Sequence, residues 1–237
     1  MFGLFREKSY KQSPFFTFCP RFVFKLDPSR NLQKNYWKHQ KNRDPHGYDK
    51  YEADTNKHTP TLFGEIEARI AKSDSILDLG CNCGFMLSAM KKLGYSKLIG
   101  VDICKNAIEH GKKKFDLSNV ELIAGSYEEV LPKLVSDNRQ FDLVYSGGST
   151  ISLVHPSFDV IKHMCAVSRK YVIMVGDDGV GVLYPRLWEY EFGRNGFMLV
   201  KLLRPANGKP LVVNRKDEQD VLKVYQRIKD VDNIIKR

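Results

Sequence analysis

Between residues 75 and 175, short apolar runs alternate with segments of helical periodicity, and this alternation restricts the fold more than any other feature of the chain. Helices that connect parallel strands produce this pattern, because each crossover must return the chain to the same edge of the sheet. The runs that predict strands cover residues 75–79, 97–101, 120–124, 141–145 and 171–175. The segments that predict helices cover residues 85–93, 105–115, 128–135 and 158–167. The sequence therefore predicts an α/β domain with helices on both faces of a mostly parallel sheet.

The chain before this region has a different composition. Residues 1–58 are basic and aromatic, and they predict an N-terminal extension with one short helix over 31–42. Thr59 followed by Pro60 is typical of a helix start, because threonine caps a helix and proline fits its first turn. We expect the main domain to span residues 59–216.

After residue 180, the chain is expected to complete the sheet with antiparallel strands. A helix over 183–192 is followed by apolar runs at 197–203 and 211–214, which are separated by an Asn-Gly pair. Two strands joined by such a pair form an antiparallel hairpin. Apolar residues at helical spacing then predict a C-terminal amphipathic helix over 217–237.

The formal net charge of +10 is concentrated at the two ends of the chain. Residues 1–50 carry 11 Lys and Arg against 4 Asp and Glu, and residues 197–237 carry 10 against 5. Basic ends suit an anionic partner, such as nucleic acid, a phosphorylated small molecule or a membrane surface. The alternative is an ordinary solvated surface, because charge alone identifies no ligand.

The five cysteines are odd in number, and their spacing fits neither a disulfide framework nor a zinc site. We therefore expect no metal and a reducing, cytoplasmic environment. The chain contains no run of about 18 apolar residues, so we expect no transmembrane helix. Charges interrupt the apolar residues at the N-terminus, which does not resemble a secretory signal.

The segment ILDLGCNCG, at residues 76–84, joins the first predicted strand to a helix through a glycine-rich turn. A turn of this kind brings backbone N–H groups and a helix N-terminus close to a ligand. Gly80 permits a close approach because it has no Cβ atom. Asn82 stands where such turns often carry glycine, and asparagine tolerates the left-handed backbone region better than other residues.

Asp102 closes the second predicted strand, 22 residues after Gly80. An acidic residue about 20 residues after the turn commonly accepts hydrogen bonds from the hydroxyls of a ribose. The alternative is that Asp102 only caps the helix that starts near Lys105. Asp78 lies just before the turn, where its charge would repel a pyrophosphate and attract a cationic ligand. These charges favour a sulfonium nucleoside over a dinucleotide.

At these residues the chain resembles the class I S-adenosylmethionine (AdoMet) dependent methyltransferases, over roughly residues 59–214. The resemblance implies a Rossmann-like seven-stranded sheet whose last strand is antiparallel, and AdoMet as cofactor with S-adenosyl-L-homocysteine as product. An acidic residue that is common at the adenine position of the family is absent here, so Ser126 would supply the polar contact. The cofactor residues that the resemblance implies are Asp78, Gly80, Asn82 and Gly84 at the turn, Asp102 and Ile103 at the ribose, Ser126 and Tyr127 at the adenine, and Ser146 and Gly147 near the methyl group.

Three segments are expected at the carboxyl edge of the sheet, where an acceptor would meet the cofactor. His155 is the candidate general base, because imidazole titrates near neutral pH; alternatively it packs against the following helix. Asp177 and Asp178 would contact the substrate or orient His155, unless they only form a turn.

The third segment lies in the N-terminal extension. Its candidate substrate residues are Tyr36, Trp37, His39 and Arg43. Aromatic side chains with polar tips often cover an active site, although the same residues would also serve to pack an added helix on the domain.

Residues 141–156, FDLVYSGGSTISLVHP, are distantly similar to methyltransferases that modify sugars and surface-polysaccharide precursors. Those proteins often carry histidine where this chain has Ser152, which puts the assignment of the base in question. We therefore expect O-methylation of a small acceptor: a saccharide, a nucleotide-linked sugar or a phosphorylated metabolite. The alternatives are an RNA methyltransferase that uses the basic N-terminal arm, and a non-catalytic AdoMet-binding module.

Overall fold

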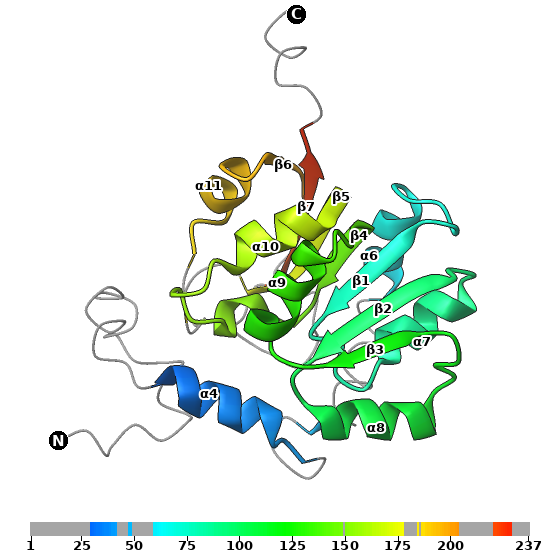
Figure 1. Ribbon diagram of the computed structural model, residues 1–237. Coiled ribbons are helices and arrows are strands. Elements are labelled where there is room, and N and C mark those ends of the chain that lie inside the picture. Colours follow the sequence, from blue (N-terminus) through cyan, green and yellow to red (C-terminus); the bar gives the residue numbers. More distant parts are fainter. Residues whose placement is uncertain are drawn as a thin grey trace, which may run out of the picture.

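The computed structural model describes residues 29–41, 47–48, 59–148, 150–177, 184, 186–203 and 220–228. Within these residues, seven strands form one sheet in the order β3-β2-β1-β4-β5-β7-β6 (Figure 1). The strands are β1 (Ser75–Leu79), β2 (Lys97–Asp102), β3 (Glu121–Ala124), β4 (Phe141–Ser146), β5 (Ser168–Asp177), β6 (Phe197–Leu203) and β7 (Asp220–Arg227). The helices are α4 (Ser29–Lys38), α6 (Thr59–Glu67), α7 (Phe85–Lys92), α8 (Lys105–Lys114), α9 (Tyr127–Ser136), the 3-10 helix η1 (Thr150–Leu153), α10 (Val160–Val167) and α11 (Trp188–Gly193).

The first five strands are parallel, and β7 enters the sheet in the opposite direction. β1 pairs with β2 and β4, β2 pairs with β3, and β4 pairs with β5, all in parallel. β7 pairs antiparallel with β5 on one side and with β6 on the other. This order confirms the predicted Rossmann-like sheet with an antiparallel last strand.

The prediction of a C-terminal helix is wrong for residues 220–227, which form strand β7. β7 fills the gap between β5 and β6, so both of its backbone edges are paired and both of its faces are covered. A strand that is buried on both faces loses the alternation that identifies strands, and its apolar residues then also fit a helical spacing. The predicted return strand at 211–214 and residues 229–237 lie outside the described residues.

The helix predicted over 183–192 starts later, because α11 begins only at Trp188. Arg186 and Leu187 are described without helical structure, directly after Pro185 in the sequence. The shift is small, but it places Trp188 at the first turn of α11, where it packs in the core.

The strands supply two hydrophobic clusters, one on each face of the sheet. The first cluster includes residues of α9, α10 and α11, and the second includes residues of α6 and α7. Alternate residues of β1 divide between them: Leu77 and Leu79 belong to the first cluster and Ile76 to the second. Figure 1 accordingly shows α9 and α10 in front of the sheet, with α6 and α7 on its other side.

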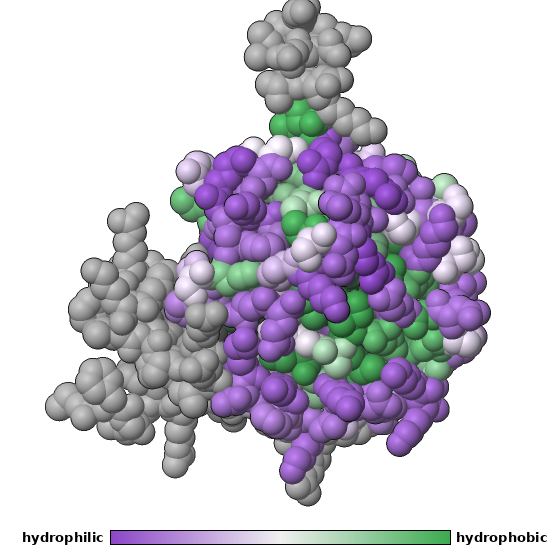
Figure 2. Space-filling view, viewed as in Figure 1, coloured by the Kyte–Doolittle hydropathy of each residue, from purple (hydrophilic) through white to green (hydrophobic). Residues whose placement is uncertain are grey.

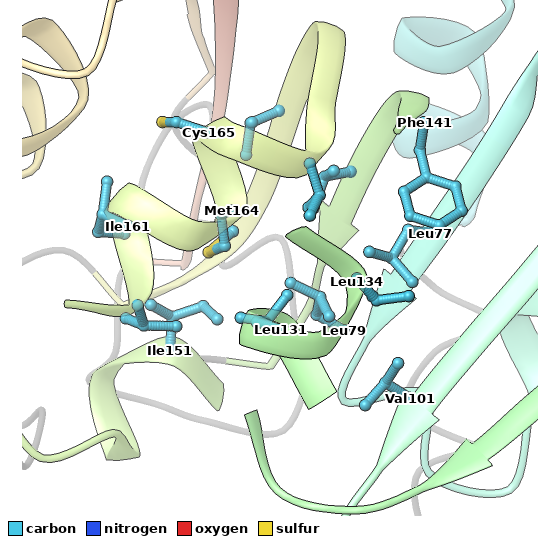
Figure 3. Packing of buried hydrophobic residues seen from close by; sticks show 14 of the residues in the cluster. Leu77, Leu79, Val101, Leu131, Leu134, Phe141, Ile151, Ile161, Met164 and Cys165 are labelled. Atoms are coloured by element: carbon cyan, nitrogen blue, oxygen red, sulfur yellow. The ribbon is translucent and has the colours of Figure 1, made fainter. Parts of the chain in front are cut away.

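The loop after β4 is anchored in the first cluster. Figure 3 shows Leu131 and Leu79 side by side between α9 and β1, with Ile151 of η1 close to the same group. Ile151 is fully buried, and it is joined in this cluster by Met164 of α10. Because Ile151 fixes η1, its neighbours Thr150 and Ser152 have defined positions at the carboxyl edge of the sheet.

The surface seen in the same orientation is mostly hydrophilic, with hydrophobic residues showing through in its middle (Figure 2). In the described part of the chain, no helix combines the length and the apolar character that a membrane span requires.

Candidate functional site

The glycine-rich turn folds back onto the end of β2. The N–H groups of Gly80 and Cys81 both donate to the carbonyl oxygen of Val101, at 2.8 and 3.1 Å. Gly80 and Asn82 have left-handed backbones, with φ of 83° and 51°. The expectation that Asn82 adopts this conformation is confirmed, and its side-chain oxygen accepts a hydrogen bond from the N–H of Cys83 at 2.7 Å.

Asp102 is hydrogen-bonded to the turn itself. Its Oδ2 accepts from the N–H of Asn82 at 2.8 Å, and its Oδ1 accepts from the N–H of Cys104 at 2.7 Å. The carboxylate thus joins the end of β2 to the end of β1, and residues 78–84 lie next to residue 102 as expected. Each oxygen keeps a second lone pair, so the carboxylate can still accept hydrogen bonds from the hydroxyls of a ligand. Ile103 follows directly and is half-buried.

Asp78 lies in the buried β1 strand and is only 2% exposed. Burial, and secondarily the negative charge of Asp102, raise the pKa of Asp78 from 3.8 to about 8. Burial also raises the pKa of Asp102, although the N–H groups of Cys104 and Asn82 oppose this shift. Among the described residues, no lysine or arginine lies within ion-pair distance of either carboxylate.

Ionising the buried Asp78 beside the half-buried Asp102 without a cation is costly, because ionised groups in a low-dielectric site need a counter-charge. A ligand that carries an ammonium and a sulfonium group would supply this counter-charge, whereas a pyrophosphate would be repelled. The residues at the turn therefore fit the methionine end of AdoMet, and they fit a dinucleotide poorly.

Side chains from α9 and η1 lie directly over Gly80. A Cβ atom built on Gly80 would lie 2.7 Å from the hydroxyl of Tyr127 and 2.9 Å from the side chain of Thr150. Tyr127 donates to Thr150 Oγ1 at 3.1 Å, and Thr150 Oγ1 lies 2.8 Å from Ser146 Oγ. Ser146 Oγ in turn donates to the carbonyl of Leu79 at 3.1 Å. A chain of hydroxyls therefore connects α9 with the ends of β4 and β1.

Ser126 has a structural role at the start of α9. Its N–H and its hydroxyl both donate to Glu129 Oε2, at 2.9 and 2.8 Å. These bonds satisfy the helix terminus in the manner of a capping box. With its hydrogen given to Glu129, the hydroxyl retains only acceptor capacity, so contact with adenine stays a prediction in which Ser126 would accept from the amino group.

A cleft opens beside the hydroxyl chain, at the carboxyl ends of β4 and β5 and the start of β7. It is small and open to solvent, with a cavity volume of about 20 Å³, which is room for about one water molecule. Its polar lining residues are Ser146, Thr150, Ser152 and Lys223. Its other lining residues are Ile151, Met174, Val175, Gly176, Trp188 and Val221. The cleft shares Ser146 and Thr150 with the chain of hydroxyls, and Thr150 also covers Gly80, so the cleft lies next to the predicted cofactor site.

His155 does not line this cleft. The N–H of Ser157 donates to its Nδ1 at 3.1 Å, and the hydroxyl of Ser157 lies 2.8 Å from the same atom. The ring also contacts Tyr184 edge to face, with 5.3 Å between centroids. In this arrangement a neutral ring carries its proton on Nε2, so His155 would have to leave Ser157 to act as a base. Its catalytic role stays a prediction.

The remaining acceptor candidates are only partly described. The backbone of Asp177 ends β5 at the carboxyl edge, and Asp178 lies outside the described residues, as does Arg43. Gly147 directly follows β4, where a Cβ atom would overlap the hydroxyl of Tyr145.

Helix α4 and the residues after it lie against the beginnings of α8 and α9. Lys34 forms an ion pair with Glu128, and the thiol of Cys104 donates to the carbonyl of Gln40 at 3.6 Å. Tyr36 and Trp37 pack edge to face with each other, and the exposed His39 is bonded to the Asn35 carbonyl. The N-terminal candidates thus lie near the predicted ribose and adenine positions.

Sequence reasoning missed Gln40. Its side chain is 2% exposed, and its Nε2 has no hydrogen-bond partner among the described residues. A buried amide next to Cys104 is a suitable donor to a ligand. Gln40 reaches this position only because the N-terminal segment packs near the end of β2. No local pattern in the sequence indicated that contact.

Cys81, Cys83, Cys104 and Cys165 are buried and unbonded to one another. Over the described stretches of the chain, no group of three His, Cys, Asp or Glu residues is arranged to hold a metal ion.

Comparison with known proteins concerns the domain as a whole and points to methyl transfer. Residues 76–170 match the family described as "Methyltransferase domain". The ribosomal protein L11 methyltransferase of Laribacter hongkongensis is 32% identical over 79 residues, which are 33% of this chain and 25% of that protein. A protein of Methanocaldococcus jannaschii, provisionally named as a ribosomal RNA large subunit methyltransferase, is 29% identical over 84 residues, 33% of this chain and 21% of that protein. The chain thus spans about a quarter of the length of the curated relatives that it matches.

A solved methyltransferase structure shares the fold of the described residues. Magnesium protoporphyrin IX methyltransferase from Synechocystis PCC 6803, solved with bound AdoMet, superposes with a TM-score of 0.53 at 11% identity. The superposition covers 96% of this chain and 100% of that one. The family match over residues 76–170 and the strand order together show a methyltransferase domain with the Rossmann-like fold of AdoMet-dependent methyltransferases.

Proposed function

We propose that this protein transfers a methyl group from AdoMet to a small polar acceptor that carries an anionic group. The observation that carries the proposal is the pair of the buried Asp78 and the half-buried Asp102 beside the left-handed turn at Gly80, with no described cation to compensate it. Asp78 would face the methionine end of the cofactor, and Asp102 would hold its ribose.

The cofactor supplies a methyl group on a positively charged sulfur. The protein's own contribution is to hold the acceptor in line with that group, because fixed proximity supplies much of the rate of a bimolecular displacement. The cleft bordered by Ser146 and Thr150 is the acceptor site in this proposal, since it adjoins the turn at the carboxyl edge of the sheet. An acceptor hydroxyl would also need a base, for which His155 remains the candidate.

The finer identity of the acceptor remains a proposal. O-methylation of a saccharide, a nucleotide-linked sugar or a phosphorylated metabolite, and with it a role in polysaccharide biosynthesis, rests only on the distant resemblance of residues 141–156. An anionic group on the acceptor is likewise a proposal, suggested by the basic residues at both ends of the chain.

Titration with S-adenosyl-L-homocysteine tests the cofactor assignment. We expect wild-type protein to bind it with micromolar affinity, and Asp102→Ala to weaken binding about 10- to 100-fold, because hydrogen bonds to a charged group contribute about 1.5–3 kcal/mol. Calorimetry measures both affinities. Asp102→Asn keeps one side-chain oxygen that can accept a hydrogen bond from the N–H groups of the turn. Comparing it with Asp102→Ala separates the loss of the ribose contact from a collapse of the turn.

Asp137→Ala is the matched control, because Asp137 is exposed at the end of α9, away from the turn. This variant should bind like wild type. Absence of binding to wild-type protein, or equal binding by Asp102→Ala, would remove the basis of the proposed function.

RNA is the second candidate acceptor. It is favoured by the 11 basic against 4 acidic residues in the first 50, and by the name of the Methanocaldococcus jannaschii relative. RNA binding would weaken steeply as salt rises, because phosphate contacts release counterions. A filter-binding assay with ribosomal RNA between 50 and 300 mM salt, about the range over which such contacts are lost, distinguishes this candidate from a small acceptor.

A further inference from the structure

Gln40 carries a buried amide whose N–H donors are unsatisfied. Its side chain is only 2% exposed, and Nε2 has no hydrogen-bond partner among the described residues. A buried N–H group without an acceptor costs free energy, because it has lost its hydrogen bonds with water. Glutamine is mostly exposed in proteins, and buried polar groups are nearly always hydrogen-bonded. An acceptor supplied by a bound molecule would account for this donor.

The backbone of Gln40 is held close to the carboxylate of Asp102. The thiol of Cys104 donates to the carbonyl oxygen of Gln40 at 3.6 Å, and the N–H of Cys104 donates to Asp102 Oδ1 at 2.7 Å. Cys104 therefore binds both Gln40 and the carboxylate that is predicted to hold the ribose. Figure 1 shows the end of α4 close to the start of α8, as this contact requires.

A second contact joins the N-terminal extension to the other hydrogen-bond partner of Asp102. Cys83 Sγ lies 4.0 Å from the carbonyl oxygen of Tyr48, and the Tyr48 ring contacts His110 of α8 with 4.7 Å between centroids. Cys83 directly follows Asn82, whose N–H donates to Asp102 Oδ2 at 2.8 Å. The extension thus contacts the protein next to both oxygens of the Asp102 carboxylate.

A ribose hydroxyl has the groups that Asp102 and Gln40 both require. An ionised carboxylate only accepts hydrogen bonds, so a hydroxyl that binds Asp102 must give its proton to the carboxylate. The oxygen of that hydroxyl still has lone pairs that can accept a hydrogen bond, and a glutamine amide offers two N–H donors. One hydroxyl can therefore bind the carboxylate and the amide at the same time.

We propose that Gln40 is a cofactor-binding residue, and that its Nε2 donates to the oxygen of a ribose hydroxyl whose proton is held by Asp102. The N-terminal extension then forms part of the nucleoside site and does more than pack on the domain. The amide is enclosed in the ligand-free chain, so a nucleoside reaches it only when this segment moves outward and then closes again. The inference rests on the proposed function for the identity of the nucleoside as the cofactor; nucleoside binding itself does not require methyl transfer.

The test compares the full-length protein with its Gln40→Met variant, because methionine keeps the length of the side chain and removes its donors. Calorimetry with S-adenosyl-L-homocysteine should show an affinity about three- to tenfold lower for the variant, the effect of one hydrogen bond. Ligand-observed NMR titrations then use adenosine, 2′-deoxyadenosine and 3′-deoxyadenosine. Gln40→Met should weaken the binding of adenosine by the same factor and leave unchanged the binding of the deoxynucleoside that lacks the shared hydroxyl.

Thermal denaturation separates ligand binding from a structural role of the amide. Without ligand, Gln40→Met should melt at the wild-type temperature or up to about 4 °C above it, because the substitution removes an unsatisfied buried group. The matched control is Gln140→Met. Gln140 is exposed before β4, where its Nε2 donates to the carbonyl oxygen of Ala166 at 3.4 Å. This control should bind every ligand as the wild type does.

Two results would overturn the proposal: an unchanged affinity of Gln40→Met for adenosine, or an equal loss of affinity for all three nucleosides. The second result would mean that Gln40 contacts the base or only supports the packing of the segment. If S-adenosyl-L-homocysteine binding depends on Asp102 and not on Gln40, the proposed function stands and this inference fails. If S-adenosyl-L-homocysteine does not bind while adenosine binding depends on Gln40, the proposed function fails and the nucleoside site stands.

Discussion

Replacement of Asp78 by asparagine is expected to reduce the affinity for S-adenosyl-L-homocysteine about 100-fold while making the protein more stable. The two effects have one cause, which is the buried carboxyl group whose pKa is raised to about 8. In the cofactor complex the carboxylate faces a positive charge, and its loss removes that attraction. Without the cofactor the same carboxyl group lowers the free energy of unfolding.

The effect of pH on stability follows from this pKa. The folded-state pKa of about 8 lies above the unfolded value of about 3.9, so the unfolded chain releases its proton first as pH rises. Asp78 therefore lowers the free energy of unfolding progressively between about pH 4 and pH 8. Asparagine does not titrate, so Asp78→Asn should gain little at pH 4 and at most about 5 kcal/mol at pH 8. Urea denaturation at the two pH values measures the difference.

The effect of pH on binding has the opposite sense. Binding of a cationic ligand requires the ionised carboxylate, so wild-type affinity should rise about tenfold per pH unit from pH 6 to pH 8. Calorimetry in two buffers of different ionisation enthalpy should detect a released proton near pH 7. Asp78→Asn should release no proton from this site and bind with a flatter pH profile. Equal affinities of the two proteins at pH 8 would contradict the assignment of Asp78 to the cofactor.

Replacement of Gly111 by alanine is expected to cost at least about 3 kcal/mol in the free energy of unfolding and to weaken cofactor binding at least about tenfold. Gly111 lies in α8, and a Cβ atom there would overlap the carbonyl oxygen of Cys83 in the glycine-rich turn. A backbone group cannot turn aside as a flexible side chain can, so either α8 or the turn must move. Both elements carry the site, since α8 follows Asp102.

Gly64→Ala is the matched control for this variant. Gly64 lies in helix α6, and a Cβ atom there would meet no atom within 4 Å. Alanine is the better helix former, so this change should be neutral or stabilise the protein by up to about 1 kcal/mol. Thermal denaturation should show a fall of about 6–12 °C for Gly111→Ala and no fall for Gly64→Ala. A wild-type melting temperature for Gly111→Ala would contradict the described packing of α8 on the turn.

Local sequence patterns were sufficient for the first five strands and for the turn. The apolar runs of β1 and β4 are buried on both faces and are bounded by polar residues, so each is recognisable without its neighbours. Asn82 and Gly80 stand where the backbone must be left-handed, and the spacing to Asp102 follows from one crossover of the chain. These features depend on short stretches, and the sequence expresses them directly.

The other features arise only when distant segments meet. Strand β7 forms because it pairs with β5 on one side and β6 on the other. Local periodicity cannot indicate these pairings, so the apolar residues of β7 predicted a helix instead. Lys223 and Gln40 are buried only in the folded chain. There Lys223 lies beside Trp188, and Gln40 lies beside Cys104 after the end of β2.

The sequence by itself determined the parallel sheet, the turn and the carboxylate partner of that turn, because each depends on residues close together in the chain. The tertiary structure alone decided the last strand, the raised pKa of Asp78 and the lysine in the cleft wall. The burial and the electrostatic environment of these positions depend on side chains that are far apart in the sequence. Those side chains come together only in the folded protein.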